Sequence, residues 1–257
     1  MTYILEKNTH WQEKELNSES VVIPADWTST ALNTYADIIS GQSPASDLVA
    51  DLGLDFHQGN SLFGDKYIKP STKKIDRTRA PKIAPARSIL FSVRAPVGEV
   101  NIACTEMCIG RGLAALTTEH VSEWMYFRLK SMSSVFKKLS TGTTFEGITA
   151  KNLGAVTFGC PPLNEQTAIA NILSDQENLV AHYNDLIALH EKRFAYLSYE
   201  LLSGRLRLKK NGIAIEFIRN DLFSCMSVNN LDVDIPDQWF VKSLGAVAVT
   251  SIGSTPP

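Results

Sequence analysis

One short segment of the chain concentrates positive charge of the kind that binds phosphate. Residues 60–95 contain nine Lys and Arg residues against Asp65 and Asp76, whereas residues 1–59 contain two Lys and nine acidic residues. Each phosphate that a protein neutralises releases counterions, so a concentrated basic region favours a nucleic-acid backbone. The net charge of the whole chain is only −2, and a solvated basic face is the alternative interpretation. The nine basic residues are Lys66, Lys69, Lys73, Lys74, Arg77, Arg79, Lys82, Arg87 and Arg94.

The sequence contains no recognisable catalytic or metal-binding motif. It has no phosphate loop, no dinucleotide-binding glycine motif, no serine elbow and no H-E-x-x-H pair. His182 and His190 are eight residues apart on a predicted helix and therefore too far apart for one tight metal site. The cysteines form no C-x-x-C pair, and we expect them to be small buried side chains. We therefore predict a chain without catalytic chemistry of its own; the cysteines are Cys104, Cys108, Cys160 and Cys225.

Length and composition bound the class of protein. A chain of 257 residues can form one large domain or two ordinary ones, and a hydrophobic fraction of 44% is typical of a globular protein. No apolar run approaches the ~20 residues that a membrane helix needs. The first residues, 1–7, lack the features of a signal peptide. These features predict a protein of the cytoplasm that does not enter the membrane.

The elements that would carry the basic segment indicate an α+β fold. We predict a mixed α/β domain over residues 1–160, of which residues 1–20 form an N-terminal extension. Runs rich in β-branched and aromatic residues predict strands at 88–93, 99–103 and 155–158. Apolar spacing predicts one helix over residues 121–139.

A long helix follows this domain in the predicted spacer segment, residues 161–208. Pro161 and Pro162 end the last strand, Asn164 is the expected N-cap, and Gly204 suits the left-handed C-terminal position. About 39 helical residues would span roughly 58 Å. Apolar residues repeat every seven positions over five heptads, which predicts a coiled-coil seam that needs a partner. One long core helix of a larger fold is the alternative; the predicted interface residues are Leu173, Val180, Tyr183, Ile187, Phe194, Leu197 and Leu201.

A repeat at an offset of 212 residues links the two ends of the chain. Ile23, Pro24 and Trp27 recur as Ile235, Pro236 and Trp239, and four further identities follow without a gap. Seven matches that include a Trp and two Pro residues are hard to obtain by chance. We therefore predict that residues 209–257 comprise a linker and the truncated start of a second copy of the domain.

Several motifs together resemble the specificity subunits of type I restriction-modification enzymes. The resemblance runs from about residue 21 to the end of the chain. Its most specific elements are the entrance to the long helix, Pro161-Pro162-Leu163-Asn164-Glu165-Gln166, and the turn Arg94-Ala95-Pro96-Val97-Gly98. The similarity extends over residues 38–44, 58–60, 92–98, 142–144, 168–173 and 201–207.

The resemblance implies an architecture and a set of partners. A full subunit has two target recognition domains, each followed by a long helix, and the helices pack antiparallel as a spacer between two halves of a double-stranded DNA site. Modification subunits carry the S-adenosylmethionine-dependent methyltransferase chemistry, and restriction subunits act with ATP and Mg. This chain would need no cofactor. It matches a half-length form, and two copies could pair as an isologous homodimer that reads an interrupted palindrome.

The same resemblance directs attention to particular side chains. Amide and guanidinium groups read base edges, and hydroxyl and ammonium groups contact phosphates. Arg94 stands in a motif that could equally support the fold. The predicted base-reading residues are Gln42, Gln58, Asn60 and Arg94, and Ser43 is a further predicted DNA-binding residue. The predicted phosphate contacts are Lys66, Lys69, Lys73, Lys74, Thr143 and Thr144.

Two other functions remain open at this level. The chain could be an assembly scaffold that binds partner subunits through the long helix with negligible affinity for DNA. It could also be a fragment of a methyltransferase that has lost its catalytic domain.

Overall fold

The computed structural model describes residues 10–45, 48–50, 52–140, 147–211, 214–219, 223–228, 231–236, 239–243 and 246. The chain divides into two compact units, Met1–Glu177 and Asn178–Pro257, and the long helix α5 (Leu163–Leu202) runs across the division. The first unit is the mixed α and β domain that the sequence predicts, and a long helix follows it, so the α+β fold class is confirmed. The predicted domain boundaries stay predictions.

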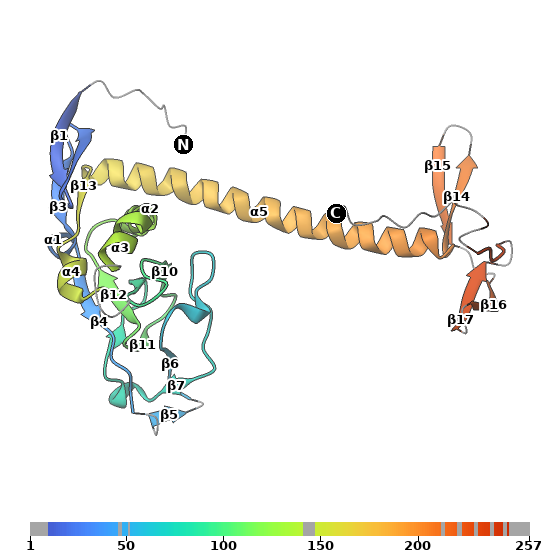
Figure 1. The fold of residues 1–257 in the computed structure, drawn as a ribbon, viewed down its shortest axis with the longest axis horizontal. Coiled ribbons are helices and arrows are strands. Elements are labelled where there is room, and N and C mark those ends of the chain that lie inside the picture. The colour runs from blue at the N-terminus through green and yellow to red at the C-terminus, as the bar shows by residue number, and fades with distance from the viewer. Residues whose placement is uncertain are drawn as a thin grey trace, which may run out of the picture. The chain divides into compact units, whose positions relative to one another are not determined.

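A four-stranded antiparallel sheet forms the centre of the first unit (Figure 1). Its strand order is β10-β9-β12-β4, and its central strands are buried except for Thr117 at the end of β12, because they carry almost only apolar side chains. Helices α2 (Ser122–Ser131) and α3 (Ser133–Ser140) supply side chains to the same core. The strands are β4 (Asp37–Ser40), β9 (Ile89–Ser92), β10 (Val100–Ile102) and β12 (Leu113–Thr117).

A second sheet of five short strands carries most of the basic segment. Its order is β5-β7-β6-β11-β8, and β6 and β11 run parallel. Apolar residues that include Ile68, Leu90 and Ile109 form a separate core cluster. The strands are β5 (Val49–Ala50), β6 (Leu54–His57), β7 (Lys74–Ile75), β8 (Ile83–Ala84) and β11 (Met107–Ile109), and the 3-10 helices are η2 (Asn60–Leu62) and η3 (Arg77–Arg79).

A third group of elements lies where α5 begins. Strand β3 (Thr28–Ala31) pairs with β13 (Thr157–Cys160), and the hairpin of β1 (Trp11–Leu16) and β2 (Glu19–Pro24) is fixed beside them. Asn17 in the hairpin turn accepts a hydrogen bond from the Thr157 amide at 2.8 Å and donates one to the Thr157 carbonyl at 2.8 Å. The short helices α1 (Leu32–Tyr35) and α4 (Ala150–Gly154) complete this group.

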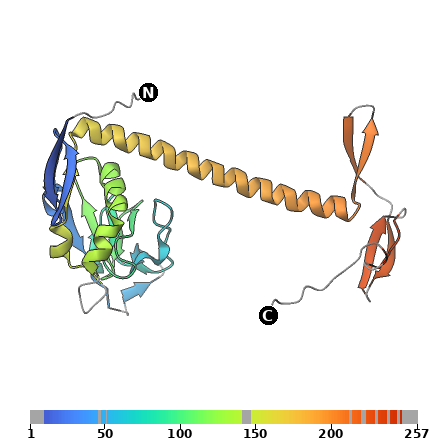
Figure 2. The ribbon, with the colours of Figure 1, turned by 45° about the horizontal axis from the view of Figure 1, so that its top comes forward.

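The two ends of the chain contain hairpins of the same register. Strand β16 (Phe223–Val228) pairs with β17 (Leu231–Pro236), and its register repeats that of β1 with β2 at the offset of 212 residues. The shared pairing extends the sequence repeat from single residues to a structural unit. Figure 2 shows this hairpin and that of β14 (Leu206–Asn211) and β15 (Ala214–Arg219) as separate two-stranded sheets.

Several local predictions need correction. The predicted helix over residues 121–139 is two helices that break at Met132, where the Ser131 hydroxyl donates to the Arg128 carbonyl and competes with the helical pattern. Helix α5 begins at Leu163, one residue before the predicted cap, and the amides of Glu165 and Gln166 donate to the Pro162 carbonyl.

The structure also tests the predictions for Gly204 and for the cysteines. Gly204 has a φ of 74°, as predicted for the helix end. Cys108 and Cys160 are buried as expected, but Cys104 is exposed because it lies in the turn between β10 and β11. The side chain of Cys225 lies outside the described residues. No helix in the described part of the chain has both the length and the apolar composition to cross a membrane.

Candidate nucleic-acid interface

Three loops that are far apart in the sequence meet at the ends of strands β4, β6 and β11. The backbone amide of Gln42 donates to the Ile109 carbonyl at 2.9 Å. The side-chain amide of Gln58 donates to the Ser43 hydroxyl at 2.8 Å, and the Arg111 amide reaches the same hydroxyl oxygen at 3.4 Å. The structure therefore brings together Gln42, Ser43 and Gln58, which the sequence predicts as DNA-binding residues.

Glycines allow these loops to approach so closely. A Cβ atom at Gly41 would lie 2.1 Å from the Gly110 carbonyl oxygen, and one at Gly110 would lie 2.8 Å from Cα of Gln58. No side chain fits at such distances, because the neighbouring atoms belong to the backbone. The two glycines thus fix the spacing of the loops and leave the polar side chains on the outside.

Arg111 belongs to this cluster although the sequence analysis does not single it out. It is exposed in the turn between β11 and β12, flanked by the buried Gly110 and Gly112. A guanidinium group presents a planar fork of donors that matches the O6 and N7 acceptors of guanine. The signal in the sequence is an arginine between two glycines directly after a buried strand. We call Gln42, Ser43, Gln58 and Arg111 the polar loop cluster.

The turn Arg94–Gly98 divides into an exposed and a buried part. Arg94 is exposed, and it follows Val93, whose amide donates to the Gly112 carbonyl at 3.0 Å. Gly98 is buried with a φ of 90°, and a Cβ atom there would lie 2.9 Å from Cβ of Phe136. The end of the turn therefore supports the fold, whereas the Arg94 side chain is free to contact a ligand beside the polar loop cluster.

Asn60 takes part in a different contact. Its side-chain amide donates to a carboxylate oxygen of Glu99 at 2.6 Å. This bond uses one N–H group and leaves the amide oxygen available. Adenine recognition needs both the donor and the acceptor of the amide. The second N–H of the Asn60 amide stays available beside its oxygen, and base reading by this residue stays a prediction.

The four lysines predicted to contact phosphate fall into two pairs. Lys69 and Lys73 are exposed, and the described residues offer neither of them an ion pair. Lys74 is paired with Asp55, and Lys66 with Glu177 at 3.4 Å. Lys69 and Lys73 are therefore available to contact a phosphate, whereas Lys66 and Lys74 already neutralise carboxylates.

The ion pair with Lys74 changes the pKa of Asp55. Burial by itself would raise the pKa of Asp55, but the hydrogen bonds from Lys74 and from the Ser71 amide, with the charges of Lys74 and His57, outweigh it and lower the pKa.

Thr143 and Thr144, the predicted hydroxyl contacts, lie outside the described residues. The described residues contain no group of three or more His, Cys, Asp or Glu side chains that could hold a metal ion.

The predicted seam of α5 is an exposed apolar stripe in the second unit. Val180, Tyr183, Ile187 and Phe194 are all exposed, and Phe194 has 74% of its surface accessible. Leu197 and Leu201 are half-buried. Contiguous apolar surface of this kind marks an interaction site. Leu173, in the first unit, is at the margin of exposure with 38% accessible.

A sheet-rich domain with an exposed polar loop cluster, continuous with a long helix that carries an exposed apolar stripe, is the arrangement of a recognition domain. The family model described as the type I restriction modification DNA specificity domain matches residues 24–197, which is more than half of the chain. The chain therefore belongs to this family of specificity domains.

Individual relatives agree with this assignment. The chain is 36% identical over 200 residues to the putative type I restriction enzyme MjaX specificity subunit of Methanocaldococcus jannaschii, a match that covers 75% of this chain and 46% of the relative. It is 29% identical over 260 residues to the MjaIX specificity subunit of the same organism, with 96% of this chain and 57% of the relative covered. The chain thus spans about half the length of these relatives.

Solved structures show the same fold. A chain from a structural study of assembly and conformational transition of the type I R-M system superposes with a TM-score of 0.60 and 35% identity, over 68% of this chain and 44% of that one. The HsdS subunit from Thermoanaerobacter tengcongensis superposes with a TM-score of 0.55 and 34% identity, over 64% of this chain and 40% of that one.

Proposed function

We propose that this chain reads one half of a bipartite double-stranded DNA site for a type I restriction-modification complex. The observation that carries the proposal is the polar loop cluster, in which Ser43 on one loop accepts hydrogen bonds from the Gln58 side chain and the Arg111 backbone amide on two others, while the side chains of Gln42, Gln58 and Arg111 are exposed. Such groups read base edges in the major groove. The chain would act in the cytoplasm, where that DNA lies.

The chemistry of the complex would belong to its other subunits. Modification subunits would dock on this chain and transfer methyl groups from S-adenosylmethionine, and restriction subunits would use ATP and Mg. This chain would supply sequence specificity and a frame for assembly without a catalytic centre. Its α5 stripe would pack against the equivalent helix of a second copy, so that two polar loop clusters read the halves of an interrupted palindrome.

Arg111→Ala tests base reading. We expect it to reduce discrimination at one or two base positions by about 1–3 kcal/mol, because a bidentate contact to guanine is lost. The measurement is methylation mapping of DNA modified by the chain together with its modification subunits. Arg79→Ala is the matched control: it removes the same charge from η3, which contributes no residue to the polar loop cluster. A methylated motif that Arg111→Ala leaves unchanged would contradict base reading by this residue.

Replacing Lys69 and Lys73 together by alanine tests the phosphate contacts. We expect the slope of log affinity against log salt concentration to become smaller in magnitude by about 2, because each lost phosphate contact removes roughly 0.9 from that magnitude. Fluorescence anisotropy with a random duplex measures the slope. The double variant Lys137→Ala, Lys192→Ala has the same net charge, and its exposed lysines lie on α3 and α5.

Three outcomes of this titration separate recognition from scaffolding. An unchanged slope in the control variant, with a smaller slope in the Lys69, Lys73 variant, supports a DNA interface at the basic segment. Equal slopes in both variants would contradict that interface. No binding of the intact chain at low salt, with its modification subunits present, would instead favour an assembly scaffold, a role to which the exposed α5 stripe is suited.

A further inference from the structure

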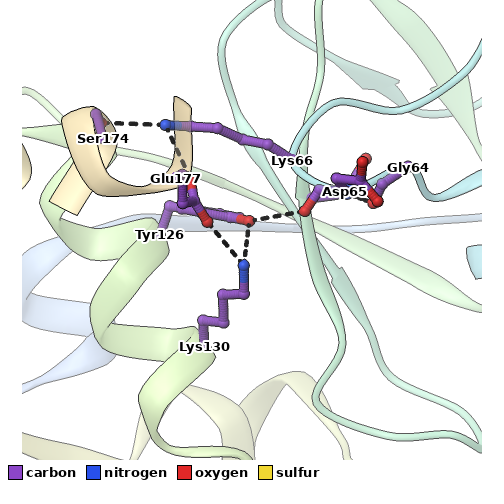
Figure 3. Close-up of polar contacts among 8 residues, drawn as sticks. Gly64, Asp65, Lys66, Tyr126, Lys130, Ser174 and Glu177 are labelled. Carbon is purple, nitrogen blue, oxygen red and sulfur yellow. Dashed lines mark hydrogen bonds and ion pairs between the residues drawn. The ribbon is translucent and has the colours of Figure 1, made fainter. Parts of the chain in front are cut away.

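Glu177 lies about four turns into α5 and is contacted by two lysines from other elements. Its carboxylate is 2.8 Å from Nζ of Lys130 on α2 and 3.4 Å from Nζ of Lys66, which stands in the loop after η2. Lys66 also donates to the hydroxyl of Ser174 at 3.1 Å. Figure 3 shows both lysines converging on this short stretch of α5.

Tyr126 closes the network from α2. Its hydroxyl accepts a hydrogen bond from Lys130 at 3.1 Å and donates one to the Asp65 carbonyl at 3.2 Å (Figure 3). Nζ of Lys66 lies 4.9 Å from the ring centre of Phe127, within the range of a cation–π contact. Three segments that are distant in the sequence, namely the loop at 64–66, α2 and α5, therefore share one connected set of charges.

Partial burial makes this network stronger than a surface ion pair. The side chains of Lys66 and Glu177 are only 16% and 28% exposed, whereas isolated pairs in full solvent contribute almost nothing. Burial alone would lower the pKa of Lys130, but the hydrogen bonds and charges of Glu177 and Tyr126 outweigh it and raise the pKa. Loss of the carboxylate would leave two ammonium groups close together without their shared counter-ion, which is unfavourable in a half-buried site.

The loop that Glu177 holds also belongs to the candidate interface. Residues 60–69 carry Asn60 at one end and the exposed Lys69 at the other. The loop is closed by a hydrogen bond of 2.9 Å from the Lys69 amide to the Leu62 carbonyl. A shift of this loop relative to α5 would displace groups that are proposed to contact DNA.

We propose that Glu177 is a positioning residue that locks the loop 60–69 of the recognition surface onto the first four turns of α5. The proposal rests on the function proposed above. The lock makes the recognition surface and the start of the spacer helix one rigid body, so that the helix can transmit a fixed separation between two half-sites. Lys66 thereby acquires a role within the protein in place of the phosphate contact that its charge suggests.

Two readouts on Glu177→Gln test the proposal. We expect amide hydrogen exchange in residues 62–69 and 170–177 to become at least about tenfold faster, since the lysines lose their counter-ion. In methylation mapping with the modification subunits, we expect the half-site sequences to persist while spacers one base pair longer or shorter become methylated as well. Asp175→Asn is the matched control, because Asp175 is exposed on the same helix and the charge change is identical.

The outcomes are distinguishable from those for DNA recognition itself. Unchanged exchange in Glu177→Gln would overturn the lock, whatever the DNA result. Faster exchange with a single unchanged spacer length would overturn the positioning role. A wild-type chain that directs no bipartite methylation would overturn the proposed function, while exchange would still decide the lock. Should Glu177→Gln fail to fold, Lys66→Met keeps the apolar stem against Phe127 and is expected to show the same two effects in weaker form.

Discussion

Replacing Phe136 with alanine is expected to lower the free energy of unfolding by about 3–5 kcal/mol, the usual cost of deleting a buried aromatic ring. Phe136 is fully buried on α3, and its ring lies 4.8 Å from that of Phe91 in an edge-to-face arrangement. It also supports Gly98, so the cavity would open directly beneath the turn that presents Arg94. Urea unfolding followed by circular dichroism measures the loss.

The long helix offers a control with the same chemical change. Phe194→Ala also removes a phenyl ring, but from a position that is 74% exposed. Folding of a single chain therefore buries little of the surface of this ring. We expect the unfolding free energy of the monomer to change by less than about 0.5 kcal/mol. A loss below 1 kcal/mol for Phe136→Ala, or equal losses for the two variants, would show that the core is not packed as described.

Ile187→Asp is expected to weaken self-association of the chain by at least about a hundredfold, or ~2.7 kcal/mol. Ile187 is 57% exposed in the middle of the apolar stripe of α5. Full burial of an isoleucine contributes about 1.5–3 kcal/mol, a symmetric dimer contains the residue twice, and a carboxylate in its place would lose its water without gaining a partner. Sedimentation equilibrium measures the association constant.

Asn178→Asp provides the control for this variant. It adds the same negative charge to an exposed position of α5 that is outside the heptad set of the stripe. We expect it to leave the association constant within about twofold. A wild-type chain that sediments as a strict monomer at tens of micromolar would contradict the dimer, and equal effects of the two variants would place the interface elsewhere. In a monomeric variant we expect half-site contacts to persist while the interrupted palindrome is no longer selected.

The sequence by itself determined the elements that depend on local chemistry. Heptad spacing and a terminal glycine placed the long helix, which the structure finds at Leu163–Leu202 with Gly204 in the left-handed region. Runs rich in β-branched and aromatic residues placed β9 and β10, whereas β4 and β12 of the same sheet were not predicted. The repeat at 212 residues predicts equivalent segments, and hairpins of one register lie at the start of both. These signals depend on residues that are close together in the sequence, or on a segment that is repeated as a whole. They can therefore be recognised in the sequence without the tertiary structure.

Only the tertiary structure decided which charges are available to a ligand. Lys66 and Lys69 are three residues apart in the basic segment, but Lys66 is held by Glu177, 111 positions further on, while Lys69 stays exposed. Arg111 joins Ser43 and Gln58 because two strand ends and a glycine contact bring the loops together. An ion pair or a shared loop edge depends on distances of a few ångströms between segments far apart in the chain. Charge and residue type indicate a class of binding chemistry, and the packing of the sheets selects the residues that are free to perform it.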